Sequence, residues 1–265
     1  MSDAAVSAPA PGGVVLLAGP GESTLIVHDA LASRVPIEAV LLEQPPSRLK
    51  LVRNRARRLG VGVAVGQLAF QVAAVPALRR LGRARAQAIR DEFGLRPREI
   101  PEAVLRRVAS ANAEETIALL QALAPRVVVV NGTRILSKRL LGCVQAVFIN
   151  MHAGITPLYR GVHGGYWALA QGQPEHCGVT VHLVDPGVDT GGVLGQALIR
   201  PTPEDNFTTY PLLQLAAGIP ILVEAVEAAL DGRPESVPHP PGNSTQWYHP
   251  TLASYLKTFA RHGVK

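Results

Sequence analysis

The sequence predicts an α/β protein with a Rossmann-like, mostly parallel sheet flanked by helices. Residues 14–19 form a short β-branched, apolar run that ends in Gly-Pro-Gly, as a buried strand entering a turn does. A helical pattern follows over residues 22–33, and residues 37–43 form a second apolar run. Strand–helix–strand units of this kind build parallel sheets.

A second unit of the same kind begins near Asn112. Asn112 and Glu115 have the spacing of a helix capping box, and one apolar helical face follows as far as Pro125. The apolar runs 126–130 and 146–150 are then expected to be neighbouring buried strands. The polar residues that end the second run therefore lie at the carboxyl end of a parallel strand, where ligands bind in open α/β sheets.

The remaining pattern completes the sheet and its cover. Residues 178–185 alternate in polarity, as a half-exposed strand does, and residues 193–200 are expected to pair with them. A helical stretch over residues 210–230, interrupted by Pro220, is expected to cover the sheet.

The chain of 265 residues is expected to form one main domain with additions. Residues 1–13 lack the basic flank and the apolar stretch of a secretory signal and are expected to be a disordered tail. The main domain covers residues 14–235 with a helical insertion at 47–98, and residues 236–265 form a short C-terminal extension. The two cysteines give no disulfide framework, which favours a cytoplasmic location.

The insertion, residues 47–98, is strongly basic in a chain of net charge +6. Its uncharged middle, residues 59–78, contains glycines, glutamines and Pro76, which make a poor membrane-spanning helix, so packing between two basic helices is favoured. The charge run is most simply a solvated face. A peripheral contact with a membrane or another polyanion stays open, because basic flanks around apolar faces suit anionic lipid.

Polar side chains suited to acyl transfer follow two of the expected strands. Asn150 and His152 project from one strand end, and Asp189 lies in a Gly-rich loop after another. Each alone has an ordinary explanation as a turn former or strand-end hydrogen-bonding group. Together they suit attack of an amine on a carbonyl, with an N–H donor for the oxyanion and an imidazole for the proton. A nearby carboxylate would favour the imidazolium form of His152.

The stretch NMHAGITPLYRG, followed by GVTVHLVDPGVDTGG, resembles the catalytic region of the folate-dependent formyltransferases. These comprise glycinamide ribonucleotide, methionyl-tRNA and amino-sugar N-formyltransferases, and the resemblance covers residues 112–200 well and the first strand more faintly. It implies that Asn150, His152 and Asp189 are catalytic and that 10-formyltetrahydrofolate is the formyl donor. The histidines lack a compact ligand spacing, so no metal site is expected.

The resemblance also implies a folate pocket made of two loops. Its members are Thr133, Arg134, Ile135 and Leu136 in the first loop, and Asp185, Pro186, Gly187 and Val188 in the second. Arg134 is as readily a charged surface residue. His182 matches a position that often supports the catalytic acid, and a structural histidine is the alternative.

Candidates for acceptor binding are Gly19 and Gly21 in the first loop and His163 in a later glycine-rich loop, each with an ordinary turn as the alternative. The Gly-x-Gly pattern is a weak phosphate signal. Glycinamide ribonucleotide formyltransferases hold the substrate phosphate with a Gly-Asn-Gly-Ser-Asn loop here, whereas this chain has Pro20 and Glu22. A carboxylate beside a phosphate is unfavourable, which argues against a purine-pathway substrate.

The expected reaction is transfer of a formyl group from 10-formyltetrahydrofolate to a primary amine of a small acceptor, an amino sugar or sugar nucleotide. Nucleic acid is not expected as a partner, because the chain after Gly232 is shorter than the C-terminal domain of methionyl-tRNA formyltransferases. Hydrolysis of 10-formyltetrahydrofolate, a non-catalytic membrane-surface or binding module on the same fold, and a homo-oligomer stay open. A nucleotide-dependent oxidoreductase would need Glu43 as its ribose ligand.

Overall fold

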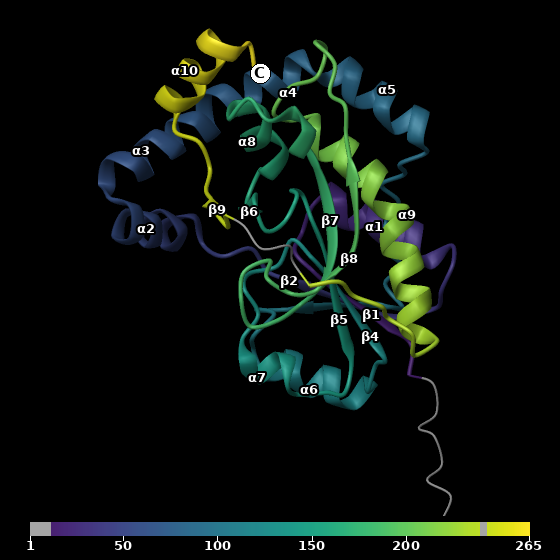
Figure 1. Ribbon diagram of the computed structural model, residues 1–265. Helices are drawn as coiled ribbons and strands as arrows, with labels where there is room; N and C mark the ends of the chain where they lie inside the picture. The colour runs from purple at the N-terminus through teal and green to yellow at the C-terminus, as the bar shows by residue number, and fades with distance from the viewer. Residues whose placement is uncertain (1–11, 239–242) are drawn as a thin grey trace, which may run out of the picture.

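A computed structural model describes residues 12–238 and 243–265, and a seven-stranded sheet runs through its centre (Figure 1). The strand order is β3-β2-β1-β4-β5-β7-β8. The first five strands run parallel, and β7 pairs antiparallel with both of its neighbours, β5 and the edge strand β8. The strands are β1 (Val14–Ala18), β2 (Ile37–Glu43), β3 (Leu105–Val108), β4 (Val127–Asn131), β5 (Val147–His152), β7 (Gly178–Leu183) and β8 (Val193–Leu198). The predicted fold class is confirmed.

Helices cover both faces of this sheet (Figure 1). Successive strand residues point to opposite faces, so Leu16 of β1 joins the cluster under α1 (Glu22–Ala32) and α9 (Tyr210–Leu230), whereas Val15 joins the cluster under α6 (Glu114–Leu123) and α7 (Lys138–Leu141). The central strands β1 and β4 are buried along their whole length, which explains their unbroken apolar sequences.

Two local features differ from the sequence prediction. The edge strand β3 was not predicted, because its sequence carries two exposed arginines, Arg106 and Arg107, where a buried strand would be apolar. The capping box at Asn112 was wrong: α6 starts at Glu114 after Ala113. The side chain of Asn112 instead bonds the loop after β4, donating to the Ile135 carbonyl (2.9 Å) and accepting from the Ser137 N–H (2.7 Å).

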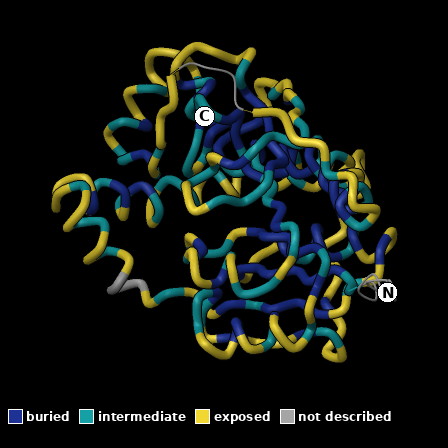
Figure 2. The backbone as a smooth tube through the Cα atoms, turned by 60° about the horizontal axis from the view of Figure 1, so that its bottom comes forward, coloured by how far each residue is buried: buried dark blue, intermediate teal, exposed yellow. Residues whose placement is uncertain are grey.

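The segment 47–98 is helical in the structure. It contains α2 (Arg48–Leu59), then one long helix made of α3 (Val61–Ala69), a π-helical turn η1 (Phe70–Ala74) and α4 (Val75–Leu81), and then α5 (Arg83–Phe93). Gly60, with φ of 91°, reverses the chain between α2 and α3. Figure 2 shows exposed residues prevailing along this α2–α3 hairpin, whereas the buried ones gather in the sheet.

The C-terminal residues contact both the insertion and the main domain. A short strand, β9 (Gln246–Trp247), pairs in parallel with β6 (Arg160–Gly161), and α10 (Leu252–His262) packs against α3 and η1. An aromatic cluster joins Phe70 of η1 to Phe207 and to Tyr255 of α10, with ring centroids 4.9 Å apart in both pairs. The tail predicted over residues 1–13 lies, up to residue 11, outside the described residues.

Candidate active site

Asn150 and His152 project from the carboxyl end of β5, where the sequence placed them. The antiparallel register with β7 sets Asn150 directly opposite His182. The side-chain amide nitrogen Nδ2 of Asn150 lies 3.1 Å from Nε2 of His182. The other ring nitrogen of His182, Nδ1, lies 2.7 Å from the backbone carbonyl of Leu183, the next residue in the chain. His182 is therefore locked in place with Nδ1–H as a donor and Nε2 turned toward the amide.

Asp189 reaches the same point from the loop after β7. Its Oδ2 lies 3.5 Å from Nδ1 of His152, and its Oδ1 lies 3.6 Å from Nε2 of His182. The backbone N–H of Gly161 donates to Oδ2 at 2.9 Å. Asp189 has φ of 52°, a conformation that aspartate tolerates better than most residues, and this turn aims its carboxylate back at the strand. The structure thus gathers Asn150, His152, His182 and Asp189 into one cluster, the Asn-His-Asp cluster.

His152 is buried with a protein oxygen beside each ring nitrogen. Besides Asp189 at Nδ1, the carbonyl of Tyr159 lies 2.7 Å from Nε2. Gly154 makes this approach possible, since a Cβ there would lie 2.4 Å from the Tyr159 carbonyl oxygen and 2.8 Å from His152 Nε2. Only glycine fits this position without moving the catalytic candidate.

Asp189 acts on His152 in the expected direction, because it raises the pKa of the imidazole, but a second effect is larger. Burial lowers the pKa of His152, and the opposing effect of Asp189 does not outweigh it, so the neutral ring rather than the imidazolium is the resting form. For Asp189, burial would raise the pKa, but the neighbouring His182, the nearby His152 and the hydrogen bond from the Gly161 N–H together lower it. The cluster therefore rests as a carboxylate beside a neutral imidazole.

The first predicted folate loop follows β4 and is held in place by residues that the sequence reasoning did not assign to it. The backbone N–H of Arg134 donates to Glu43 Oε1 at 2.8 Å, and its guanidinium Nε lies 2.9 Å from Glu43 Oε2. Asn112 holds the far side of the loop, as described above. Leu136 is buried in the core, whereas Ile135 is 58% exposed. Arg134 is thus a structural ion-pair partner, and Ile135 and the loop backbone are the parts open to a ligand.

Glu43 is fully engaged in this support. Its Oε2 also accepts the backbone N–H of Ala111 at 2.8 Å, and its side chain is 4% exposed. A ribose ligand must offer its carboxylate to the bound nucleotide. The carboxylate of Glu43 is not free to bind a ribose, so the structure gives no support to the oxidoreductase alternative, which needed Glu43 for that contact.

The second predicted folate loop, residues 185–188, is a turn closed by its own first residue. Asp185 Oδ1 accepts from the Gly187 N–H at 3.0 Å and from the Thr190 hydroxyl at 2.6 Å. Pro186 and Gly187 lie toward the surface of this turn. Arg160 donates to the Val188 carbonyl at 2.9 Å, which ties this loop to β6 and fixes the approach of Asp189.

The two glycines of the first loop, Gly19 and Gly21, lie in different surroundings. Gly19 lies against the loop after β4, and a Cβ there would lie 2.3 Å from the Gly132 carbonyl oxygen, so Gly19 allows two loops to touch. Gly21 is exposed and precedes α1 with open space around it. The residues of this loop that line a cavity are the next two, Glu22 and Ser23, which the sequence reasoning did not select.

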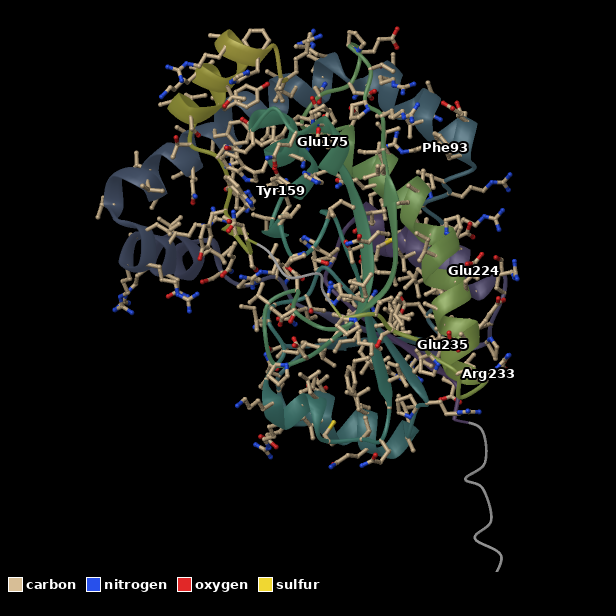
Figure 3. All side chains as sticks on the ribbon, viewed as in Figure 1. Phe93, Tyr159, Glu175, Glu224, Arg233 and Glu235 are labelled. Atoms are coloured by element: carbon tan, nitrogen blue, oxygen red, sulfur yellow. The ribbon has the colours of Figure 1, made fainter. Side chains whose placement is uncertain are left out.

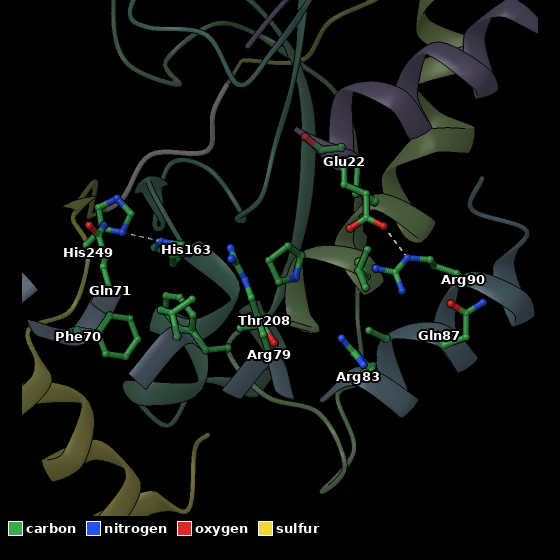
Figure 4. A pocket seen from close by; sticks show the side chains of 17 residues that line it. Glu22, Phe70, Gln71, Arg79, Arg83, Gln87, Arg90, His163, Thr208 and His249 are labelled. Carbon is green, nitrogen blue, oxygen red and sulfur yellow. Dashed lines mark hydrogen bonds and ion pairs between the residues drawn. The ribbon is translucent and has the colours of Figure 1, made fainter. Parts of the chain in front are cut away.

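That cavity, of about 1010 Å³, lies where the main domain, the insertion and the C-terminal extension meet (Figure 4). His163 and His249 line one side, with His163 Nε2 2.9 Å from His249 Nδ1, and Glu22 and Arg90 form an ion pair of 2.6 Å on the other. None of the four residues of the Asn-His-Asp cluster lines this cavity. The link between them is β6, since His163 is two residues beyond Gly161, whose N–H donates to Asp189.

Burial sets the charge of the histidine pair in the cavity. Burial, with smaller contributions from the nearby His249 and Arg55, lowers the pKa of His163 to about 3. Burial and Arg55 lower the pKa of His249 to about 4. The positive charge of the cavity wall therefore comes from arginines, Arg79, Arg83 and Arg90. Arg90 is paired with Glu22, whereas Arg79 and Arg83 have no carboxylate partner within residues 12–238 and 243–265.

The C-terminal extension supplies His249 and the aromatic stack near it, which the sequence reasoning left without a role. Tyr159, labelled in Figure 3, stacks on Trp247 of β9 with ring centroids 5.8 Å apart. Trp247 also stacks on Trp167 of α8 (Gly164–Ala170) at 4.7 Å. In the described part of the chain, no three His, Cys, Asp or Glu residues are grouped as a metal site would require.

Formyltransferases of several kinds resemble this chain in sequence or in fold. A family model described as "Formyl transferase" matches residues 39–226. The methionyl-tRNA formyltransferase of Anaeromyxobacter dehalogenans strain 2CP-1 is 35% identical over 179 residues, which cover 61% of this chain and 56% of that protein. The chain thus spans about half the length of this curated relative, and a Synechococcus methionyl-tRNA formyltransferase is 37% identical over 52% of this chain and 42% of its own length.

Solved structures share the fold at lower identity. The phosphoribosylglycinamide formyltransferase of Streptococcus pneumoniae has a TM-score of 0.52 at 20% identity, over 82% of this chain and 98% of that one. An N-formyltransferase from Helicobacter canadensis, solved with folinic acid and dTDP-3-aminofucose, has a TM-score of 0.54 at 14% identity, over 88% of this chain and 70% of that one. Since the family model covers well over half of the sequence, the chain belongs to the formyl transferase family.

Proposed function

We propose that this protein transfers a formyl group from 10-formyltetrahydrofolate to a primary amine of a small acceptor. In this reaction the amine nitrogen bonds to the formyl carbon, the bond from that carbon to the folate nitrogen breaks, and the amine loses a proton. The observation that carries the proposal is the Asn-His-Asp cluster, in which one carboxylate lies within 3.6 Å of two imidazoles at the carboxyl end of a central strand.

His152 is proposed as the base. At rest its pKa is lowered by burial, so it is neutral at pH 7 and can accept a proton. Its Nε2 lies 2.7 Å from the Tyr159 carbonyl, which can only accept, so Nε2 carries the proton of the neutral ring and Nδ1, 3.5 Å from Asp189, keeps its lone pair for the incoming proton. Once protonated, the ring would donate to Asp189 on one side and to the Tyr159 carbonyl on the other.

Asn150 is proposed as the donor to the developing oxyanion. Its amide group carries two N–H donors, and the described residues place a partner, His182, on Nδ2. A single amide has room for one more acceptor, and a well-placed oxyanion donor stabilises a transition state by about 3 to 4 kcal/mol. Asp189 would hold the imidazoles of His152 and His182 in these positions, so its part in the reaction is to position these two groups.

The residues of the first loop fit a folate ring. Ile135 offers an exposed apolar side chain in the loop after β4, one strand from Asn150. The loop backbone behind it is fixed by Asn112 and by Glu43, so it presents a formed edge to a flat, hydrogen-bonding ring. Ile135, Thr133 and the loop backbone, together with Asp185 to Val188, stay our proposed folate contacts, whereas the side chain of Arg134 pairs with Glu43 and that of Leu136 packs in the core.

The cavity supports an acceptor that carries negative charge. A volume of about 1010 Å³ suits a small molecule, and Arg79 and Arg83 offer two cations without carboxylate partners in the described chain. An amino sugar linked to a nucleoside diphosphate has both the amine and the anion. The Helicobacter canadensis neighbour, whose structure contains dTDP-3-aminofucose, is consistent with this acceptor class.

The experiment is a screen of amines with 10-formyltetrahydrofolate, read by mass spectrometry as a formyl adduct. Amino-sugar nucleotides are expected to give the adduct, with loss of turnover in His152→Ala and retention of folate binding. A reaction without added amine tests hydrolysis, since release of formate at the rate of the full reaction would favour the hydrolase alternative.

One observation favours a second acceptor. The relatives of 35 and 37% identity are methionyl-tRNA formyltransferases, so methionyl-tRNA belongs in the same screen. If it alone is formylated, the acceptor half of our proposal is wrong and the formyl-transfer half stands.

A further inference from the structure

The long helix of the insertion, Val61–Leu81, has an apolar face turned toward solvent. Val61, Val65, Leu68 and Val72 lie at helical spacing on one stripe and are 69, 59, 42 and 68% exposed. The other exposed residues between positions 61 and 77 are glycine, alanine, valine and proline, so this face offers no polar side chain to water. A helix on a protein surface normally presents its polar face to solvent.

The opposite face of the same helix is packed against the protein. Ala64, Gln67 and Phe70 are buried, and the Gln67 side-chain amide donates to the His249 carbonyl at 2.7 Å. These contacts hold the helix along the body of the molecule. Only 17% of the apolar stretch of this helix is buried in the protein. A helix held along the body of the molecule in this way can rest on an apolar surface without crossing it.

Arginines frame the apolar face at both ends. Arg57 and Arg58 precede it at the end of α2, and Arg79 and Arg80 follow it at the end of α4. All four are exposed, and none forms an ion pair with a carboxylate of the described residues. The surface around the stripe is therefore positive, and the fitting partner is negative.

A second copy of the chain fits this surface poorly. Because both ends of the stripe carry arginines, pairing two copies along it, in either direction, places like charges opposite one another. An anionic lipid surface meets both requirements, since the acyl region accepts the valines and the headgroups accept the arginines. We propose that the face made by Val61, Val65, Leu68 and Val72, with its arginine ends, docks this protein on an anionic membrane surface.

This surface is separate from the proposed chemistry but close to it. Gln71, Val75 and Arg79 of the same helix line the cavity, so the helix that would rest on lipid also forms one wall of the proposed acceptor site. Docking would place the cavity beside the headgroup layer. The proposal does not depend on the reaction, because the stripe and its arginines are features of the insertion alone.

The test uses the full chain and vesicles of phosphatidylcholine with or without one quarter phosphatidylglycerol, read by flotation. Binding to the anionic vesicles is expected, with weaker binding at high salt because the arginine contribution is screened. The double variant Val65→Asp/Val72→Asp is expected to bind at least tenfold more weakly. Leu198→Asp, a matched change at a 58% exposed leucine on β8, is expected to bind as the unchanged protein does.

Three outcomes would overturn the proposal. The first is absence of binding to anionic vesicles, and the second is equal binding by the double variant and the unchanged protein. The third is that the unchanged protein does not bind vesicles but forms a dimer, and that the double variant does not form this dimer. Circular dichroism checks the fold of each variant. Should Val65→Asp/Val72→Asp not fold, Arg57→Glu/Arg58→Glu leaves the stripe intact and must still lose binding to the anionic vesicles for the proposal to stand.

Discussion

Replacing Asp189 by asparagine changes the charge of the Asn-His-Asp cluster while keeping its shape. The carboxylate lies 3.5 Å from His152 Nδ1, so it stabilises the imidazolium that forms when His152 takes the amine's proton. With an effective dielectric constant of about 20, two unit charges at this distance interact by about 4 to 5 kcal/mol. The asparagine retains part of this as a hydrogen bond, so we expect a loss of about 3 kcal/mol, or roughly a hundredfold in kcat.

The assay is kcat as a function of pH with the acceptor found in the screen. His152 works as a base, so activity is lost as pH falls through its pKa, which burial already lowers below the ordinary 6.5. Asp189 raises that pKa, and its removal lowers it further. The acid limb of the profile therefore shifts to lower pH in Asp189→Asn. A general loss of structure would not move the limb in this direction.

The matched control is Asp231→Asn, an exposed aspartate that pairs with Arg233 far along the chain from the cluster. Its kcat and pH profile are expected to match those of the unchanged protein. A near-normal kcat in Asp189→Asn, or an acid limb that moves to higher pH, would refute the proposed pairing of Asp189 with His152.

Three further predictions concern the supports of the site. Gly154→Ala, which sets a Cβ 2.4 Å from the Tyr159 carbonyl, should lower the unfolding free energy by about 1 to 3 kcal/mol and abolish turnover; a normal melting temperature would contradict it. Glu43→Gln leaves Arg134 beside a neutral partner and should raise KM for the folate more than it lowers kcat, which initial rates measure. His163 is held neutral by burial, with a pKa of about 3, so the unfolded chain binds its proton first as pH drops below 6.5. Stability should therefore fall by about 2 kcal/mol for this group between pH 8 and pH 5, and His163→Gln should flatten that part of the melting curve against pH.

Local patterns were enough to predict the strands and helices at the centre of the fold. The strands β1, β2, β4 and β5 are largely buried, and strands buried on both faces have unbroken apolar sequences that are recognised without the structure. The place of Asn150 and His152 at a strand end follows from the same pattern. The pattern also indicated Asp189 as an acid in a loop after another strand, but no local rule shows that a residue 37 positions on lies beside His152, and the family resemblance supported that pairing.

Contacts between distant segments could not be read from the sequence. Asn112 looked like a helix cap because the capping box depends on local spacing, yet its amide is used by a loop 25 residues away. Glu43 accepts from the backbone of Arg134, which lies 91 residues further along the chain. His249 contacts His163 across a separation of 86 residues. These groups are far apart in the sequence and meet only in the folded chain, so their roles could be assigned only from the structure.

The central claim is that the Asn-His-Asp cluster moves a formyl group onto an amine. The most direct measurement follows a formyl group labelled with carbon-13 from 10-formyltetrahydrofolate to the acceptor by mass spectrometry, in the unchanged protein and in Asn150→Ala and His152→Ala. We predict a labelled amide with the unchanged protein and a loss of at least about a hundredfold in both variants, with folate binding retained. Label that appears only as formate, or transfer at the normal rate in either variant, would contradict the claim.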